Sequence, residues 1–499
     1  MMKKTTNDDS YSHILKYTGI FGGVQGLNIL IGVMRNKLVA LILGPEGMGL
    51  IALFSSTIKL MSDSTNLGLG MSAVREMSEA YEEGNEAKVS HIVKLIRAWS
   101  FVTAIVGTLL CVILSPWLNR WTFTWGDHTL HFVFLSPMVG LMAITSGEMA
   151  ILKGTRRLKR LAELSLYGVA GSLLISIPLY VYWHEAAIVP SLVFVAALQM
   201  LLAVSCSYRL YPLRLSFGTT LLGEGMGMVR LGVAFVLAGI LGSGVEFVIR
   251  SFLNTAGSLD VVGLYNAGYL MTVTYAGMVF QAMETDYYPR LSSVSGVGAE
   301  LNGVVNRQIE VSLLLVAPLL VAFMVAAPIL LPLLYSAKFL PIMGMMKLAI
   351  LSMYVRAVVV PIEYIALSRG DSWSYLFQET VYDVLVVVFV VVGYRLLGLD
   401  GTGWALVLAG VCNMLVALAF TRWRYGYRLS RSVRAYALLQ VPLGVLAYAV
   451  SLVCQGWTYW LGGSLLALLS LAMSVYILHT KSHLWNSLVS KIKSRAHHG

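Results

Sequence analysis

Two cations interrupt a stretch of sequence, residues 28–54, that is otherwise strongly apolar. Arg35 and Lys37 break the apolar run, which resumes at once and then turns in the sequence G-P-E-G at residues 44–47. This turn is too short to hold a domain, so it must join two hydrophobic segments as a hairpin. Charges within a membrane-spanning segment are costly and usually face the protein interior or a water-filled cavity. The hairpin therefore predicts one wall of a polar chamber in a membrane transporter.

Two further cations are each one helical turn from an acid. Asp63 follows Lys59 by four residues, and Arg250 follows Glu246 by the same spacing. Residues at i and i+4 are neighbours on the surface of a helix. We interpret each couple as a structural ion pair, with the alternative that the acid exchanges its partner for substrate or for a cation during transport.

Three other acids lie in or near apolar segments, namely Glu148, Glu363 and Asp383. An acid in such a segment is typical of a proton or sodium site. Arg356 precedes Glu363 by seven residues and therefore lies on about the same helix face, so the two are expected to pair.

The composition indicates a polytopic helical membrane protein. Of the 499 residues, 57% are hydrophobic and 12% are charged, with a mean hydropathy of +0.75. A soluble protein of this size would not be so apolar. The net charge of +11 is explained by basic residues in alternate loops, so no nucleic-acid partner is expected. The four cysteines stand singly, which argues against a metal site or a disulfide framework.

We expect about 14 membrane-spanning helices, because a hydrocarbon core about 30 Å thick requires about 20 residues rising 1.5 Å each. Their expected limits are 14–43, 47–70, 92–115, 130–152, 163–183, 187–208, 228–256, 262–283, 309–334, 342–368, 375–394, 401–421, 434–453 and 458–479.

The distribution of basic residues predicts the orientation. Lysines and arginines crowd residues 153–160 and 422–434, whereas the intervening loops carry few cations. Basic loops remain cytoplasmic, so an even number of spans places both termini in the cytoplasm. The basic tail, residues 481–495, agrees with this orientation, and the polar first ten residues do not resemble a cleavable signal peptide.

The chain also repeats at an offset of about 215 residues. Matches at this offset include Arg35 with Arg250, Arg75 with Arg290, and Glu163 with Glu379. The repeat predicts one six-helix lobe in residues 1–215, a second in residues 216–432, and two additional helices with a basic tail in residues 433–499. Because six is even, the lobes run in the same direction, as in transporters that rock around a central site.

The runs G-V-M-R-N-K-L-V-A-L-I-L-G-P-E-G-M-G-L (residues 32–50) and L-G-L-G-M-S-A-V-R-E (residues 67–76) resemble Wzx-type O-antigen flippases. These belong to the multidrug/oligosaccharidyl-lipid/polysaccharide exporter superfamily. The match covers roughly the first 100 residues, while the two-lobed, 14-span organisation fits the whole chain. The resemblance implies a V-shaped pair of six-helix bundles around a central cavity in the bacterial inner membrane. It also implies movement of undecaprenyl-diphosphate-linked oligosaccharide from the cytoplasmic to the periplasmic leaflet.

The resemblance also implies roles for individual cations. In the related lipid II flippases, cations on the first, second and eighth spans face the cavity. Arg35 matches the first of these and Lys59 lies near the second, whereas residues 263–283 contain no arginine. In those relatives the last two helices form a groove for the lipid tail, and the last two spans here are expected to do the same.

The implied cargo sets a chemical requirement. A diphosphate that crosses the low-dielectric core needs fixed cations to replace its solvation. Arginine offers a planar fork suited to phosphate oxygens, and lysine offers a point charge. We therefore predict that Arg35, Lys59, Arg250 and Lys37 bind the diphosphate, with a snorkelling or structural charge as the alternative for each. No catalytic residue or cofactor is expected. A coupling proton or sodium ion, surrounding membrane lipids and a polysaccharide polymerase or assembly complex are the expected partners.

Three other functions remain open. A cation-coupled drug antiporter of the same superfamily often carries an acid on its first span, whereas residues 12–43 contain basic residues and no acid. A membrane enzyme of polysaccharide assembly usually needs a sizeable external loop. The longest one expected here, residues 116–129, is short, and the chain lacks D-x-D, G-x-S-x-G and H-E-x-x-H motifs. A passive scaffold would not need charges inside its spans.

Overall fold

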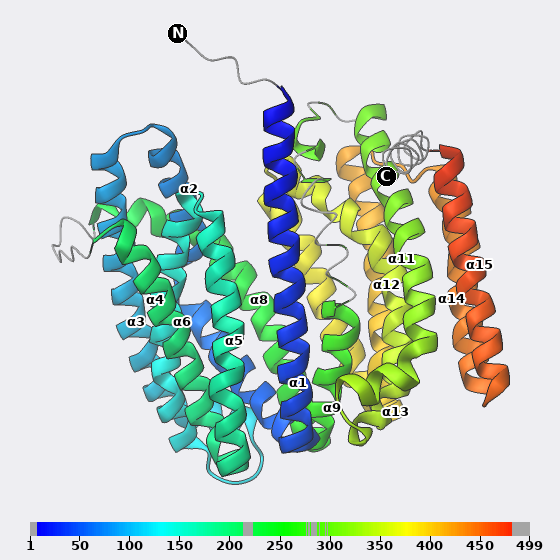
Figure 1. The fold of residues 1–499 in the computed structure, drawn as a ribbon, viewed down its shortest axis with the longest axis horizontal. Coiled ribbons are helices and arrows are strands. Elements are labelled where there is room, and N and C mark those ends of the chain that lie inside the picture. The colour runs from blue at the N-terminus through cyan, green and yellow to red at the C-terminus, as the bar shows by residue number, and fades with distance from the viewer. Residues whose placement is uncertain are drawn as a thin grey trace, which may run out of the picture. The chain divides into compact units, whose positions relative to one another are not determined.

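A computed structural model describes residues 7–212, 223–275 and 298–481, together with several positions between 277 and 296. In these residues the chain is helical, without a β-strand (Figure 1). Nine described stretches are long and apolar enough to cross a membrane. Three of them each cover all or much of two predicted spans, namely Gly26–Thr65, Lys159–Leu210 and Ser372–Tyr425. The predicted all-α, polytopic architecture is thereby confirmed.

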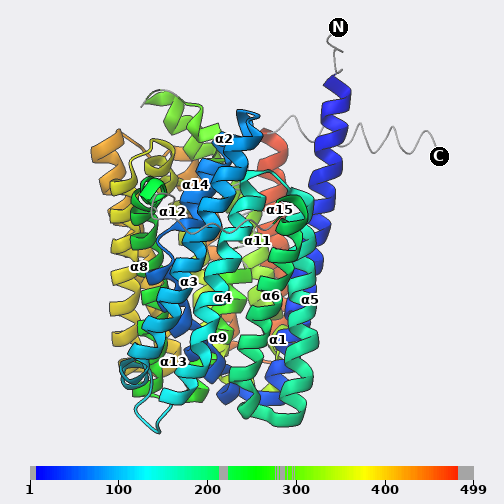
Figure 2. The same cartoon turned by 90° about the vertical axis from the view of Figure 1, so that its left-hand side faces the viewer.

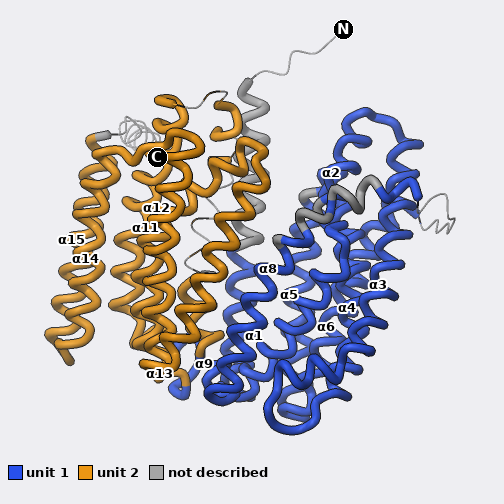
Figure 3. Tube along the Cα trace, turned by 180° about the vertical axis from the view of Figure 1, so that it is seen from behind, with its two compact units in different colours: residues 1–264, 333–338 blue, residues 265–332, 339–499 orange. Residues whose placement is uncertain are grey.

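The chain divides into two compact units (Figure 3). Unit 1 comprises residues 1–264 and 333–338, and unit 2 comprises residues 265–332 and 339–499. These units follow packing, whereas the predicted lobes follow a sequence offset, so the lobe boundaries at 215 and 432 stay a prediction.

Unit 1 is built around a layer of long helices that lie side by side (Figure 2). Helix α4 packs against both α3 and α6, and α5 packs against α1 and α6. The elements are α1 (Asn7–Thr65), α2 (Leu69–Glu82), α3 (Glu86–Thr122), α4 (Thr129–Gly154), α5 (Leu158–Trp183), the short 3₁₀ helix η1 (His184–Ala187), α6 (Ile188–Leu210), α8 (Met226–Ala256) and α9 (Leu259–Tyr269), whose last residues belong to unit 2.

Helix α1 contains the predicted turn. The backbone of Gly44 has φ 67° and ψ −169°, a conformation that a residue with a Cβ rarely adopts. Pro45 follows and is suited to the first position of the next helical segment. The chain therefore changes direction at this point, and α1 consists of two helical segments that correspond to the first two predicted spans (Figure 1).

The second segment of α1 packs closely on α8 and on the start of α9. A Cβ added at Gly232 of α8 would overlap the carbonyl oxygen of Leu67, and one added at Gly263 of α9 would overlap that of Pro45. Glycine is required at both positions because backbone approaches backbone. Pro45 begins this α1 segment and Leu67 follows its end, so backbone contacts at both ends fix it against α8 and α9, and α1 also packs along α8.

The polar stretch after α1 forms α2 and the start of α3, and both are amphipathic. One face of α2 buries Ala73, Met77 and Ala80 against apolar residues of α3 and α4. At the start of α3, the side chain of Asn85 accepts a hydrogen bond from the backbone N–H of Lys88 and caps the helix. Most of the acidic side chains of this stretch are left on the exposed face.

Unit 2 contains the end of α9 and the elements that follow it. These are the π-helical turn η2 (Leu270–Tyr275), α11 (Ala299–Leu334, whose last two residues belong to unit 1), the 3₁₀ helix η3 (Ala337–Ile342, whose first two residues belong to unit 1), α12 (Met343–Ser368), α13 (Ser372–Tyr425), α14 (Arg431–Val453) and α15 (Trp457–Lys481). Helix α13 bends at Gly398 (φ 61°, ψ −141°), between the eleventh and twelfth predicted spans. The eighth predicted span corresponds to α9, η2 and residues that lie partly outside the described chain. The far C-terminal tail, including the predicted basic residues beyond 481, also lies outside it.

Candidate functional site

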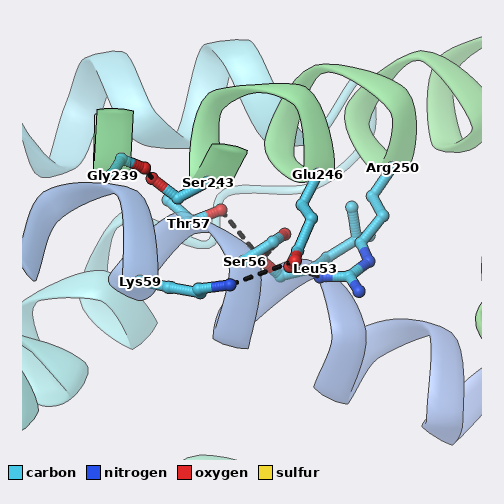
Figure 4. A network of polar contacts seen from close by, with 8 residues as sticks. All are labelled: Leu53, Ser56, Thr57, Lys59, Gly239, Ser243, Glu246 and Arg250. Atoms are coloured by element: carbon cyan, nitrogen blue, oxygen red, sulfur yellow. Dashed lines mark hydrogen bonds and ion pairs between the residues drawn. The ribbon is translucent and has the colours of Figure 1, made fainter. Parts of the chain in front are cut away.

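Three charged side chains meet within the apolar part of unit 1. Lys59 Nζ lies 3.0 Å from Glu246 Oε1, and Arg250 Nη1 lies 3.2 Å from Glu246 Oε2 (Figure 4). Lys59 comes from α1, whereas Glu246 and Arg250 come from successive turns of α8. One carboxylate is therefore shared between two cations on different helices. We call these three residues the charged cluster.

The local fold explains how the charged cluster is assembled. The i, i+4 spacing places Arg250 directly beside Glu246 on α8. The close α1–α8 packing brings Lys59 to the other side of the same carboxylate. Lys59 is 46% exposed, Glu246 34% and Arg250 14%. Lys59 and Glu246 thus keep free surface, and charges on membrane-spanning helices usually face the protein interior or a water-filled cavity.

Asp63 does not pair with Lys59 in the way that its spacing suggests. Lys59 instead reaches across to α8, and Asp63 lies against Gly239 and within hydrogen-bonding reach of Ser243. The hydroxyl of Ser243 also donates to the carbonyl of Gly239 at 2.8 Å. Asp63 thus adds a second carboxylate one turn from Lys59, on the same α1–α8 seam, without joining the ion pair.

The other two predicted cations are placed elsewhere. Arg35 Nε donates to Ser176 Oγ of α5 at 3.2 Å, and its side chain is half-buried. Lys37 Nζ donates to the carbonyl oxygen of Leu333. Of the four cations predicted to bind diphosphate, the contacts therefore bring together Lys59 and Arg250, and Arg35 and Lys37 bind other partners.

Glu148 takes part in a buried ion pair of its own. Arg97 Nε and Nη2 lie 2.9 Å and 3.3 Å from its two carboxylate oxygens. Both side chains are less than 5% exposed. Arg97 also donates to the carbonyl of Tyr211 and to Ser207 Oγ, and it stacks over the ring of Tyr208 at 4.2 Å. This network ties α3, α4 and the end of α6 together, which is a structural arrangement that sequence spacing did not indicate.

A polar cavity of about 70 Å³ lies within unit 2, between α12 and α13. Arg356, Glu363, Glu379, Tyr382 and Asn413 line it. Asn413 Nδ2 donates to Glu363 Oε1 at 2.8 Å. One water requires roughly 10–15 Å³ of such a cavity, so the cavity has room for several waters or one hydrated cation. Two carboxylates and one guanidinium leave it a net charge of −1 when all are ionised.

The prediction for this region was therefore partly incomplete. Arg356 and Glu363 were expected to pair; they line the same cavity, and Glu363 accepts a hydrogen bond from Asn413. The sequence identifies Glu379 only through its repeat match with Glu163, and it does not indicate Asn413. Asp383 lies one turn beyond Glu379 on α13 and does not line the cavity. The signal for Glu379 was available in its spacing of four residues from Asp383 within an apolar helix.

Comparison with protein families finds a match over more than half of the chain. Residues 38–344 match a family model described as "Polysaccharide biosynthesis protein". This range includes both helical segments that supply the charged cluster. A comparison with curated proteins found no match.

Solved structures with the same fold are membrane transporters. A lipid II flippase, MurJ, in an inward closed conformation, is 12% identical with a TM-score of 0.67, over 92% of this chain and 99% of that one. An inward-facing multidrug resistance MATE family transporter of the MOP superfamily is 15% identical with a TM-score of 0.62, over 81% and 94%. The MATE multidrug transporter DinF-BH is 15% identical with a TM-score of 0.60, over 86% and 100%. At these identities the likeness establishes the fold.

Proposed function

Because the chain belongs to the polysaccharide biosynthesis protein family, we propose that it is a flippase for undecaprenyl-diphosphate-linked oligosaccharide. It moves an O-antigen or related repeat unit from the inner to the outer leaflet of the bacterial inner membrane by alternating access, with both termini in the cytoplasm. The family and the transporter fold support movement of a polysaccharide precursor across a membrane. The identity of the substrate and the direction of its movement go beyond what the family and the fold support.

The observation that carries the proposal is the sharing of Glu246 by two partly exposed cations. Such a carboxylate neutralises the two cations when no diphosphate is bound. A diphosphate offers more acceptor oxygens and more negative charge, so it competes effectively for Lys59 and Arg250. Release of the cargo lets Glu246 rebind both cations, so that neither cation is left without a counter-charge within the helices.

The unit 2 cavity is the proposed coupling site. Its net charge of −1 suits one proton or one sodium ion, and oxygens of Glu363, Glu379 and Asn413 are the ligands available to that ion. Asp63 is a second candidate, because binding of cargo by Lys59 changes the charge beside it. Arg35 and Lys37 remain candidates for contacts made with the diphosphate at another stage of transport.

The test is rescue of surface polysaccharide in a bacterial strain that lacks its own flippase. The wild-type chain is compared with Lys59→Ala, Arg250→Ala and Glu246→Gln at matched protein levels. Lys88→Ala is a matched control, because Lys88 pairs with Glu83 at 2.7 Å in the polar stretch outside the charged cluster. The readout is the amount of lipid-linked oligosaccharide retained on the cytoplasmic side.

We expect rescue by the wild type and the control, and retention of substrate with Lys59→Ala and Arg250→Ala. Rescue by every variant would support the flippase function but would show that the charged cluster is not its binding site. Failure of the wild type with every repeat unit tried would favour the drug or cation antiporter, whose fold is also represented among the similar structures. An efflux assay with a cationic dye would then decide between the two.

A further inference from the structure

A second cavity, of about 250 Å³, lies on unit 1 between one end of α5 and one end of α6. Arg160 and Arg209 line it, together with Tyr167, Ser205 and Cys206. It shares no residue with the charged cluster or with the unit 2 cavity. The basic linker beside it, residues 153–160, assigns this end of the two helices to the cytoplasmic side of the membrane.

The charge of this cavity is positive and incompletely neutralised. Arg160 Nη1 pairs with Glu163 Oε2 at 3.0 Å, and Arg160 is still 53% exposed. Arg209 is exposed and forms no ion pair with any residue in the described part of the chain. Two guanidinium groups and one carboxylate give a net charge of +1. The free N–H groups are arranged in planar forks that match phosphate oxygens.

The outer faces of α5 and α6 continue from this cavity as an apolar stripe. On α5, Tyr167 is 58% exposed, Leu174 70% and Val181 51%. On α6, Phe194 is 54% exposed and Leu201 56%. Moving away from the arginines, the exposed residues thus change from charged, through tyrosine, to purely apolar. This is the order in which a phospholipid presents its headgroup, its interfacial region and its acyl chains.

We propose that the α5–α6 cavity binds the phosphate of an anionic phospholipid from the cytoplasmic leaflet. Arg209 and the free N–H groups of Arg160 hold the phosphate, and the acyl chains lie along the apolar stripe. Snorkelling alone needs no hollow between helices, whereas basic pockets between spanning helices on the cytoplasmic side are suited to anionic headgroups. The proposal does not depend on the cargo that the protein moves.

The test measures lipid binding to the purified full-length chain by native mass spectrometry. Phosphatidylglycerol and phosphatidylethanolamine are titrated onto the detergent-solubilised wild type, onto Arg160→Gln/Arg209→Gln, and onto Arg157→Gln/Lys159→Gln. The last variant removes the same charge from the same basic region, but its two residues do not line the cavity. Arg209→Gln alone is included in case the double variant folds poorly, as judged by size-exclusion chromatography.

We expect one phosphatidylglycerol to bind tightly to the wild type and to the linker variant. Its dissociation constant should rise about tenfold in the cavity variant. An equal loss of phosphatidylglycerol affinity in both double variants would contradict the proposal, because general surface charge would then explain the binding. No weakening in the cavity variant, or equal affinity for phosphatidylethanolamine, would overturn the proposal. So would displacement of the lipid by millimolar inorganic phosphate at constant ionic strength, because the site would then bind a soluble anion.

Cys206 gives an independent readout because its side chain lines the cavity. In a chain whose other three cysteines are replaced by alanine, phosphatidylglycerol should slow maleimide labelling of Cys206 severalfold. The same lipid should not slow labelling in the Arg209→Gln background. If the lipid leaves the labelling rate of Cys206 unchanged in both backgrounds, the bound lipid lies elsewhere on the protein.

Discussion

Replacement of Lys59 by alanine is expected to reduce transport far more than it reduces stability. The Lys59–Glu246 pair measures 3.0 Å, but its side chains are 46% and 34% exposed. Ion pairs that remain this accessible contribute about 0.2–1 kcal/mol to folding. Glu246 also keeps Arg250 as a partner after the substitution. The free energy of unfolding should therefore fall by less than about 1 kcal/mol.

The effect on transport is expected to be larger because the lysine loses a bond to a charged cargo. A hydrogen bond to a charged group contributes about 1.5–3 kcal/mol, and each 1.4 kcal/mol is a factor of ten. Lys59→Ala should thus slow transport of the diphosphate-linked substrate by roughly tenfold to a hundredfold. Lys59→Arg should recover part of this loss, because it restores the charge.

Arg97→Ala provides the contrasting case. Arg97 and Glu148 are less than 5% exposed, and removal of one partner of a buried pair costs about 3–5 kcal/mol. This variant should lose stability and expression, and transport should fall only in proportion to the folded protein that remains. Lys59→Ala should instead keep its stability and expression but lose transport per folded molecule.

The assay combines thermal unfolding of the purified variants with transport of a labelled polyprenyl-diphosphate sugar into reconstituted vesicles. Rates are divided by the amount of folded protein in each preparation. A loss of stability in Lys59→Ala as large as that in Arg97→Ala would contradict a role for Lys59 in binding rather than in folding. A transport rate per folded molecule of Lys59→Ala equal to that of the wild type would contradict it as well.

Three further outcomes are expected. Glu363→Gln should abolish the dependence of transport on a proton or sodium gradient, and unchanged dependence on both would remove the unit 2 cavity as the coupling site. Gly232→Leu should lower transport at least tenfold, because even its Cβ would overlap the carbonyl of Leu67 and separate α1 from α8; a wild-type rate would show that this contact is dispensable. Asp371→Ala should destabilise the chain by about 1 kcal/mol, because Asp371 caps α13. Burial acts to raise the pKa of Asp371, but its hydrogen bonds with Ser374 and other partners lower it overall, so this stabilisation is present above about pH 4 and is lost as the pH falls through the lowered value. Thermal unfolding from pH 3 to pH 7 should show the gap between wild type and Asp371→Ala closing at low pH, and a constant gap would contradict this assignment.

The arrangement of spans could be predicted from the sequence because lipid imposes a simple rule on each segment separately. A helix of about 20 apolar residues is the local solution wherever backbone groups must be satisfied without water. The two bends were also accessible, since Gly44 precedes a proline and Gly398 lies in the short polar gap between two apolar runs. Both glycines adopt positive φ angles that other residues disfavour.

The charged cluster could be predicted only where its contacts are local. The Glu246–Arg250 pair follows from spacing within one helix. The partner of Lys59 does not, because Glu246 lies 187 residues away and is reached through tertiary packing. Spacing alone favoured Asp63, which is nearer in sequence but faces Gly239 and Ser243. Asn413 could not be predicted for the same reason: it lies 50 residues from Glu363 in the sequence and contacts it only through tertiary packing.

Burial and saturation of hydrogen bonds separate the charges of this protein into two kinds. Arg97 and Glu148 are almost fully buried, and both carboxylate oxygens are bound by the guanidinium, which also binds two carbonyls and a hydroxyl. Exchange of either partner would leave a buried charge uncompensated, at a cost far above the gain from any new contact. Glu246 holds two cations from two helices with part of its surface free, so one contact can break while the other persists. Stepwise exchange of this sort is what a binding site for a diphosphate needs, because each phosphate oxygen can replace one carboxylate contact without an intermediate in which both cations are bare.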